Sequence, residues 1–137
     1  MKGLLYPEES FKIVGAAMEV YNQLGHGFLE AVYQEALALE MRMRDIPFQE
    51  HPILNILYKE HSLHQQYIPD FLVYGKIVVE IKAIKQLGPV EEAQIINYLK
   101  AAKMALGILI NFGHPQQLDW KRKIISANIP EEDKEED

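Results

Sequence analysis

The 137-residue sequence contains no cysteine, which excludes disulfides and thiolate metal ligands and is typical of a reducing compartment. No apolar stretch is long enough to cross a bilayer, and the first residues become acidic too soon for a secretory signal. The five histidines lack the spacing of zinc ligands, and glycine-rich phosphate loops and a nucleophile elbow are also missing. We therefore expect a soluble, cytoplasmic protein without a membrane partner, in which carboxylate or histidine supplies any metal site.

Positive charge is also scarce, because the formal net charge is −6, and this argues at first sight against a nucleic-acid partner. The distribution weakens that objection. The segment 131–137 holds six acids and one lysine, so it contributes −5 and leaves the remainder near −1. The sequence thus predicts one domain over residues 1–129 and an acidic, disordered tail over residues 130–137.

The order of periodic segments predicts an α/β protein with a mixed β-sheet flanked by helices, in the order α-α-β-β-β-α-β. We expect Ser10 to cap the first helix, and the short loops predict that the first three strands form an antiparallel meander. An apolar run after the third helix predicts a buried strand parallel to a neighbour. The expected segments are helices 10–24, 29–44 and 89–104, strands 48–58, 65–73, 77–84 and 106–112, and an edge strand at 118–126.

Two charged residues, Glu80 and Lys82, interrupt the apolar run Ile77–Ile84, and the preceding strand contains Asp70. A run that is apolar at nearly every position predicts a strand covered on both faces, where an unpaired charge costs several kcal/mol. Side chains alternate along a strand, so Glu80 and Lys82 point to the same side. If the register also brings Asp70 there, two carboxylates and an ammonium form a site for Mg²⁺ and phosphodiester hydrolysis.

These three residues are also consistent with an exposed strand whose Glu80 and Lys82 form only a surface ion pair, which contributes about 0 to 1 kcal/mol.

Further motifs favour the metal site. Pro69-Asp70 followed by Glu80-Ile81-Lys82 resembles the signature of the PD-(D/E)XK nuclease superfamily, and the element order matches its restriction-endonuclease-like core. The segment 27–33, Gly-Phe-Leu-Glu-Ala-Val-Tyr, resembles the pattern of the GxxExxY family within that superfamily. Gln94 and Tyr98, four residues apart on one helix face, resemble the Gln-x-x-x-Tyr element of RecB-type members.

The resemblance covers roughly residues 21–112 and implies roles for individual residues. Asp70, Glu80 and the backbone carbonyl of Ile81 would bind Mg²⁺ or Mn²⁺, and Lys82 would be the catalytic lysine. Gln94 and Tyr98 would support or bind the substrate. Glu30 would either complete the metal shell or buttress the fold, while Tyr33 is expected in the core.

The sequence therefore favours a metal-dependent nuclease that acts on DNA rather than RNA. The alternative is a catalytically silent protein of the same fold that serves as a nucleic-acid-binding or protein-interaction module. The acidic tail is relevant to both, because phosphate binding depends on cations that replace counterions. We also predict a homodimer, since compact nucleases often cut two strands by dimerising.

Overall fold

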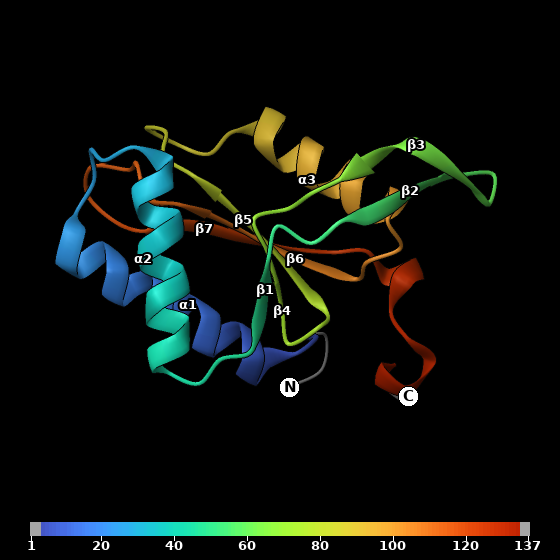
Figure 1. The fold of residues 1–137 in the computed structure, drawn as a ribbon, viewed down its shortest axis with the longest axis horizontal. Helices are drawn as coiled ribbons and strands as arrows, with labels where there is room; N and C mark the ends of the chain where they lie inside the picture. The colour runs from blue at the N-terminus through green and yellow to red at the C-terminus, as the bar shows by residue number, and fades with distance from the viewer. Residues whose placement is uncertain (1–3, 135–137) are drawn as a thin grey trace.

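The structure, a computed structural model, describes residues 4–134 and consists of a mixed β-sheet with helices on both faces (Figure 1). The helices are α1 (Pro7–Leu24), α2 (Glu30–Met43) and α3 (Pro89–Ala101). The strands are β1 (Phe48–Glu50), β2 (Leu54–Tyr58), β3 (His61–Tyr67), β4 (Phe71–Val73), β5 (Ile77–Lys82), β6 (Leu106–Asn111) and β7 (Asp119–Ile124). Single 3₁₀ turns follow at Ser126–Asn128 and Glu131–Asp133.

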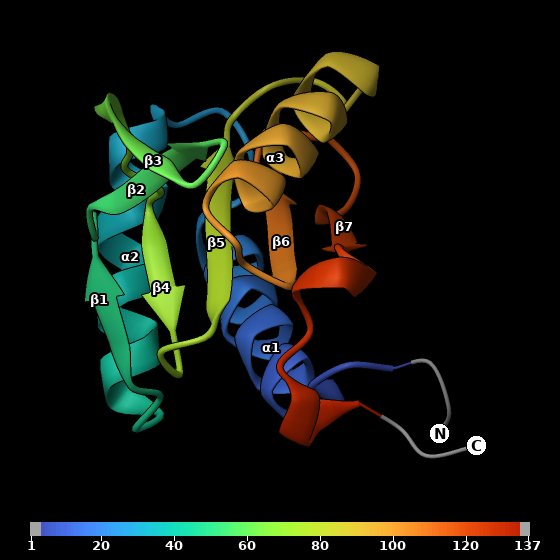
Figure 2. The ribbon, with the colours of Figure 1, turned by 90° about the vertical axis from the view of Figure 1, so that its right-hand side faces the viewer.

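The main sheet has five strands in the order β1-β4-β5-β6-β7. β5 and β6 are parallel, and every other neighbouring pair in this sheet is antiparallel. The parallel pair is possible because α3 forms the crossover between its two strands. Figure 2 shows α1 and α2 on one face of the sheet and α3 with the β2–β3 hairpin on the other. The predicted fold class, the parallel strand at 106–112 (β6) and the final edge strand (β7) are confirmed.

The predicted antiparallel pairing of the first three strands is confirmed, but the first two strands are not continuous as expected. Each of these two strands is divided, so that β1 pairs with β4 in the main sheet while β2 and β3 pair as a separate hairpin. Pro52 and Pro69 lie at the two breaks, and proline cannot donate to a strand ladder. The hairpin turn itself is Lys59-Glu60, where both residues have positive φ, as a tight two-residue hairpin loop requires.

The start of α1 also differs from the prediction. The helix begins at Pro7, whose fixed φ suits the first turn, so Ser10 lies inside the helix and does not cap it. The Ser10 side chain is buried, and its hydroxyl accepts a hydrogen bond from Arg122 Nε at 3.3 Å. α3 begins at Pro89, as predicted, and the Glu91 carboxylate accepts the Gly88 N–H just before it at 2.8 Å. Among residues 4–134, no helix combines the length and apolarity that a bilayer crossing requires.

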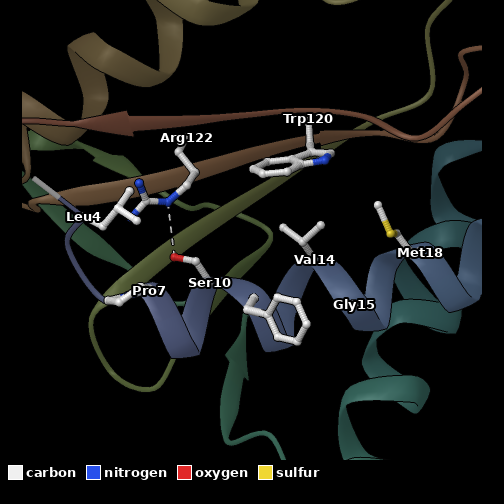
Figure 3. A pocket seen from close by; sticks show the side chains of 9 residues that line it. Leu4, Pro7, Ser10, Val14, Gly15, Met18, Trp120 and Arg122 are labelled. Carbon is white, nitrogen blue, oxygen red and sulfur yellow. Dashed lines mark hydrogen bonds between the residues drawn. The ribbon is translucent and has the colours of Figure 1, made fainter. Parts of the chain in front are cut away.

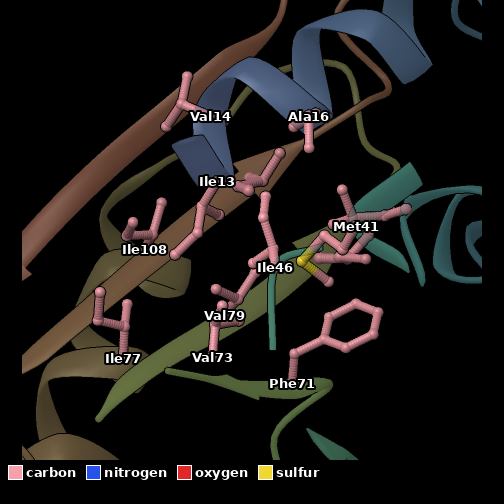
Figure 4. Close-up of a cluster of buried hydrophobic side chains, with 14 of the residues drawn as sticks. Ile13, Val14, Ala16, Met41, Ile46, Phe71, Val73, Ile77, Val79 and Ile108 are labelled. Carbon is pink, nitrogen blue, oxygen red and sulfur yellow. The ribbon is translucent and has the colours of Figure 1, made fainter. Parts of the chain in front are cut away.

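Two apolar clusters lie on opposite faces of the sheet, and β5 contributes to both. Ile77, Val79 and Ile81 point into the larger cluster beneath α1 and α2, which Figure 4 shows in part. Val78 points to the other face, into a smaller cluster with residues of α3. Close packing of α3 on β6 depends on Gly107, since a Cβ there would lie 2.8 Å from Leu99 Cδ1.

The acidic end of the chain is described as far as Lys134. Residues 131–133 form a 3₁₀ turn, and the Tyr6 hydroxyl donates a hydrogen bond to Asp133 Oδ2 at 2.7 Å. Residues 135–137 of the expected tail lie outside the described residues, so the predicted boundary near residue 129 and the disorder of the tail stay predictions.

Candidate active site

Asp70 and Glu80 face each other across the β4–β5 pair. The register pairs Phe71 with Val79, so the next positions along the two strands are Asp70 and Glu80. Each carboxylate accepts a backbone N–H from the opposite strand. Glu80 Oε1 accepts the Asp70 N–H at 3.0 Å, and Asp70 Oδ2 accepts the Ile81 N–H at 2.6 Å. The strand register therefore brings both acids together, as the predicted metal site requires.

These side-chain bonds occur where regular pairing stops. β4 begins at Phe71, and Pro69 immediately before Asp70 cannot donate to a ladder. The two carboxylates therefore satisfy backbone donors that the ladder no longer satisfies. The arrangement fixes both carboxylates at the junction between the main sheet and the β2–β3 hairpin.

Burial and mutual repulsion make ionisation of this pair unfavourable. Burial raises the pKa of Glu80 from 4.5 to about 7, with a further contribution from the Asp70 charge. The pKa of Asp70 is also raised by burial, although the Ile81 N–H, His51 and Lys82 oppose that shift. Desolvation and a like charge both penalise the ionised form of a carboxyl group. A carboxylate whose pKa is raised by burial and a specific charged neighbour is a common property of functional sites.

Lys82 and Glu30 complete the charged group. Burial raises the pKa of Glu30, the Asp70 charge raises it further, and Lys82 opposes both effects. The Lys82 charge thus acts on all three acids. Yet within residues 4–134 no ion pair of 4.0 Å or less joins Lys82 to an acid. Its ammonium is near the carboxylates while its donors remain available to another ligand.

Glu30 reaches this group from the first turn of α2, a helix that contacts β5. In Figure 1 the start of α2 lies beside the arrowhead of β5. The same helix carries Tyr33, which is fully buried and stacks on Phe112 with ring centroids 4.7 Å apart. Its hydroxyl donates to the Gly25 carbonyl at 2.5 Å. Tyr33 therefore lies in the core, as expected, while Glu30 lies at the charged edge.

Tyr98 and Gln94 occupy different environments on α3. The Tyr98 ring stacks on Tyr67 with centroids 4.3 Å apart and planes 13° from parallel. Gln94 is exposed and makes no side-chain hydrogen bond with the described residues. Tyr98 therefore contacts the strand that leads into Asp70, whereas Gln94 is free to contact a bound molecule.

Two residues near the carboxylates gave no motif in the sequence. His51 donates its backbone N–H to the Asp70 carbonyl at 3.0 Å, and its Nε2 lies 4.0 Å from Asp70 Oδ1. Asn111 is the fully buried last residue of β6. Its Oδ1 accepts the Ile84 N–H at 2.9 Å, and its Nδ2 donates to the Ile84 carbonyl at 2.8 Å. Asn111 thereby fixes the loop that follows Lys82. A polar residue at the end of an all-apolar strand was the one sequence signal for it.

The donor chemistry of the charged group suits a hard divalent cation. Asp70 and Glu80 offer oxygen ligands, and with Glu30 they exceed the charge of Lys82 by two when all are ionised. Among residues 4–134, however, no three His, Asp or Glu side chains are arranged as a ready metal cluster. A cation here would therefore rely on two carboxylates and further oxygen donors.

An apolar pocket lies elsewhere, between α1 and β7 (Figure 3). It has a volume of about 420 Å³, and Phe11, Met18 and Trp120 contribute to its walls. None of the predicted site residues lines it. The candidate chemistry therefore belongs to the charged group on β4 and β5 and not to this pocket.

The sequence model of a family described as the PD-(D/E)XK nuclease superfamily matches residues 7–123. The chain belongs to the PD-(D/E)XK nuclease superfamily. This assignment confirms the predicted superfamily and indicates a nuclease-type function with nucleic acid as the substrate class. No curated protein and no solved structure matched the chain. The narrower GxxExxY assignment stays a prediction.

Proposed function

We propose that this PD-(D/E)XK protein is a divalent-metal-dependent nuclease that hydrolyses phosphodiester bonds, with DNA as its expected substrate. The observation that carries the proposal is the facing pair Asp70 and Glu80, with Lys82 on the same side of β5. The superfamily match over residues 7–123 supports the reaction class.

In this proposal, Asp70, Glu80 and the backbone carbonyl of Ile81 hold Mg²⁺ or Mn²⁺, with Glu30 as a further ligand. The excess negative charge of the site supports this assignment, because it would repel a phosphodiester unless a cation neutralised it. When bound, such an ion polarises the phosphoryl oxygen and makes a water molecule a better nucleophile.

The protein residues contribute positioning and charge. The Lys82 ammonium donates hydrogen bonds to the attacking water and to phosphoryl oxygens, and its charge stabilises the negative charge that develops there. Its freedom from an ion pair of 4.0 Å or less within residues 4–134 supports this role. The exposed Gln94 contacts the substrate from α3, on the same side of the sheet.

A cleavage assay tests the proposal. Purified protein is incubated with supercoiled plasmid, single-stranded DNA and RNA, in Mg²⁺, in Mn²⁺ and in EDTA. We expect metal-dependent cleavage that falls by about 100-fold or more in Asp70→Asn and in Lys82→Met, since a single electrostatic group at a reacting phosphate has effects of that size. Asp45→Asn and Lys85→Met make the same chemical changes at exposed positions and should retain full activity. Cleavage that persists in both site variants would contradict the proposal.

The reciprocal bonds of Asp70 and Glu80 to backbone N–H groups also favour a second candidate, a silent member of the superfamily that binds nucleic acid or protein without turnover. In that case the carboxylates serve only to end the β4–β5 pairing. Calorimetric titration with Mn²⁺ separates the two functions, because the silent protein needs no metal affinity that depends on Asp70. The homodimer proposed for double-strand cleavage is tested separately by light scattering on the purified chain.

A further inference from the structure

Tyr67 is a buried residue whose hydroxyl has no hydrogen-bond partner among residues 4–134. It is the last residue of β3, three positions before Asp70, and it is 4 % exposed. Among residues 4–134 its hydroxyl is the only buried side-chain oxygen or nitrogen without a hydrogen-bond partner. Buried polar groups nearly always have such partners, so this exception calls for an explanation.

The unpaired hydroxyl is directed at the candidate site. The charges of Glu80 and Asp70 both act on it, with Glu80 the stronger influence of the two. The Glu80 carboxylate is also close enough to act as a hydrogen-bond acceptor for this hydroxyl, but the two groups do not have the geometry of a regular hydrogen bond. Glu80 Oε1 accepts the Asp70 N–H, whereas Oε2 accepts no hydrogen bond from residues 4–134. A free donor and a free acceptor therefore lie close to each other.

The Tyr67 ring is held in place while its hydroxyl is not. Tyr98 stacks on it in a nearly parallel arrangement, and both rings belong to the apolar cluster between the sheet and α3. Stacked aromatic pairs add stability beyond their buried area. The ring is thus fixed by α3, and the hydroxyl can change partner without moving the ring.

We propose that Tyr67 is a positioning residue whose hydroxyl donates a hydrogen bond to the Glu80 carboxylate when a divalent cation is bound, and that Tyr98 holds the Tyr67 ring for this purpose. Carboxylates that ligate metals are usually oriented by hydrogen bonds from neighbouring groups. This inference rests on the proposed metal-dependent function. In this inference Tyr98 acts only by holding the Tyr67 ring and does not contact the substrate.

Calorimetric titration of the purified chain with Mn²⁺ alone tests the hydroxyl. We expect Tyr67→Phe to weaken Mn²⁺ binding by about 10-fold, the lower end of the range for such neighbouring groups. In EDTA its urea unfolding midpoint should be unchanged or higher, because an unpaired buried hydroxyl has been removed. Tyr74→Phe makes the same change at a half-buried tyrosine in the turn between β4 and β5, and should leave Mn²⁺ affinity unchanged.

Tyr98 provides the second arm of the test. Tyr98→Phe keeps the stacked ring and should bind Mn²⁺ like the wild type, whereas Tyr98→Leu should weaken binding. Wild-type affinity in Tyr67→Phe, or a lower unfolding midpoint in EDTA without a change in affinity, would overturn the role of Tyr67 alone. Absence of Mn²⁺ binding by the wild-type protein would overturn the proposed metal site and this inference together.

Discussion

The two sides of β5 show how one strand serves two purposes. On the side covered by α1 and α2, Ile77, Val79 and Ile81 are all buried in one apolar cluster. On the side of α3, Val78 is apolar while Glu80 and Lys82 are charged. Burial of the first side stabilises the fold through the hydrophobic effect. The second side contains carboxylates with raised pKa values, which reduce stability at neutral pH.

The difference suggests that stability and chemistry are separated across the sheet. Changes on the side of α1 and α2 should mainly alter the free energy of unfolding. Changes at the charged end of the other side should alter pH dependence and activity more than stability.

Truncation of a core side chain should have the largest effect on stability. Phe71 on β4 is fully buried among residues of the larger cluster, so Phe71→Ala should lower the free energy of unfolding by about 3–5 kcal/mol. Leu72 points to the other side and is only half-buried, so Leu72→Ala should cost clearly less. Urea denaturation measures both. Equal losses of unfolding free energy in the two variants would contradict the idea that the side covered by α1 and α2 provides most of the stability.

Removal of the Glu80 charge should have an intermediate, pH-dependent effect. The pKa of Glu80 is raised from 4.5 to about 7 in the folded protein, so the folded state retains a proton that the unfolded chain loses between these values. The protonated Glu80 carboxyl group therefore adds to the free energy of unfolding below pH 4.5. This contribution is lost as the pH rises from 4.5 to about 7. The total loss is on the order of 3 kcal/mol.

Urea denaturation in EDTA between pH 4.5 and 8 measures this dependence. Because Glu80→Gln cannot ionise, its stability should fall less than that of the wild type over the same window. Glu35→Gln, at an exposed position on α2, controls for the substitution itself. If the free energy of unfolding varies with pH in the same way for the wild type and Glu80→Gln, the pKa of Glu80 is not raised in the folded protein.

Substitution of Gln94 should have the smallest effect on stability. Its side chain is exposed and unbonded to described residues, so Gln94→Ala should change the free energy of unfolding by no more than about 0.5 kcal/mol. If Gln94 contacts the substrate, loss of one hydrogen bond of about 1 kcal/mol should lower kcat/KM by roughly five-fold. Denaturation and cleavage kinetics on the same preparation test both parts. A stability loss well above 1 kcal/mol would show that Gln94 is a structural residue.

Much of the charged site could be predicted from local pattern. An apolar run interrupted by Glu80 and Lys82, with Asp70 on the preceding strand, implied that these charges needed compensation. The distribution of hydrogen bonds was not predictable. The hydrogen bonds from the Asp70 N–H to the Glu80 carboxylate and from the Ile81 N–H to the Asp70 carboxylate depend on distances between segments that no local pattern records. The same holds for the contacts of Tyr67 and Asn111.

The sequence by itself determined the element order, the helices and the parallel strand, because these follow from hydrophobic periodicity, proline and glycine positions and loop length. It predicted the antiparallel pairing of the first strands but did not determine that two of them are divided between two sheets. Both prolines at the breaks are visible in the sequence, but whether β2 and β3 extend the main sheet or form a separate hairpin beside α3 depends on contacts between segments far apart in the chain. Only the tertiary structure decided that choice, and with it which side chains surround Asp70 and Glu80.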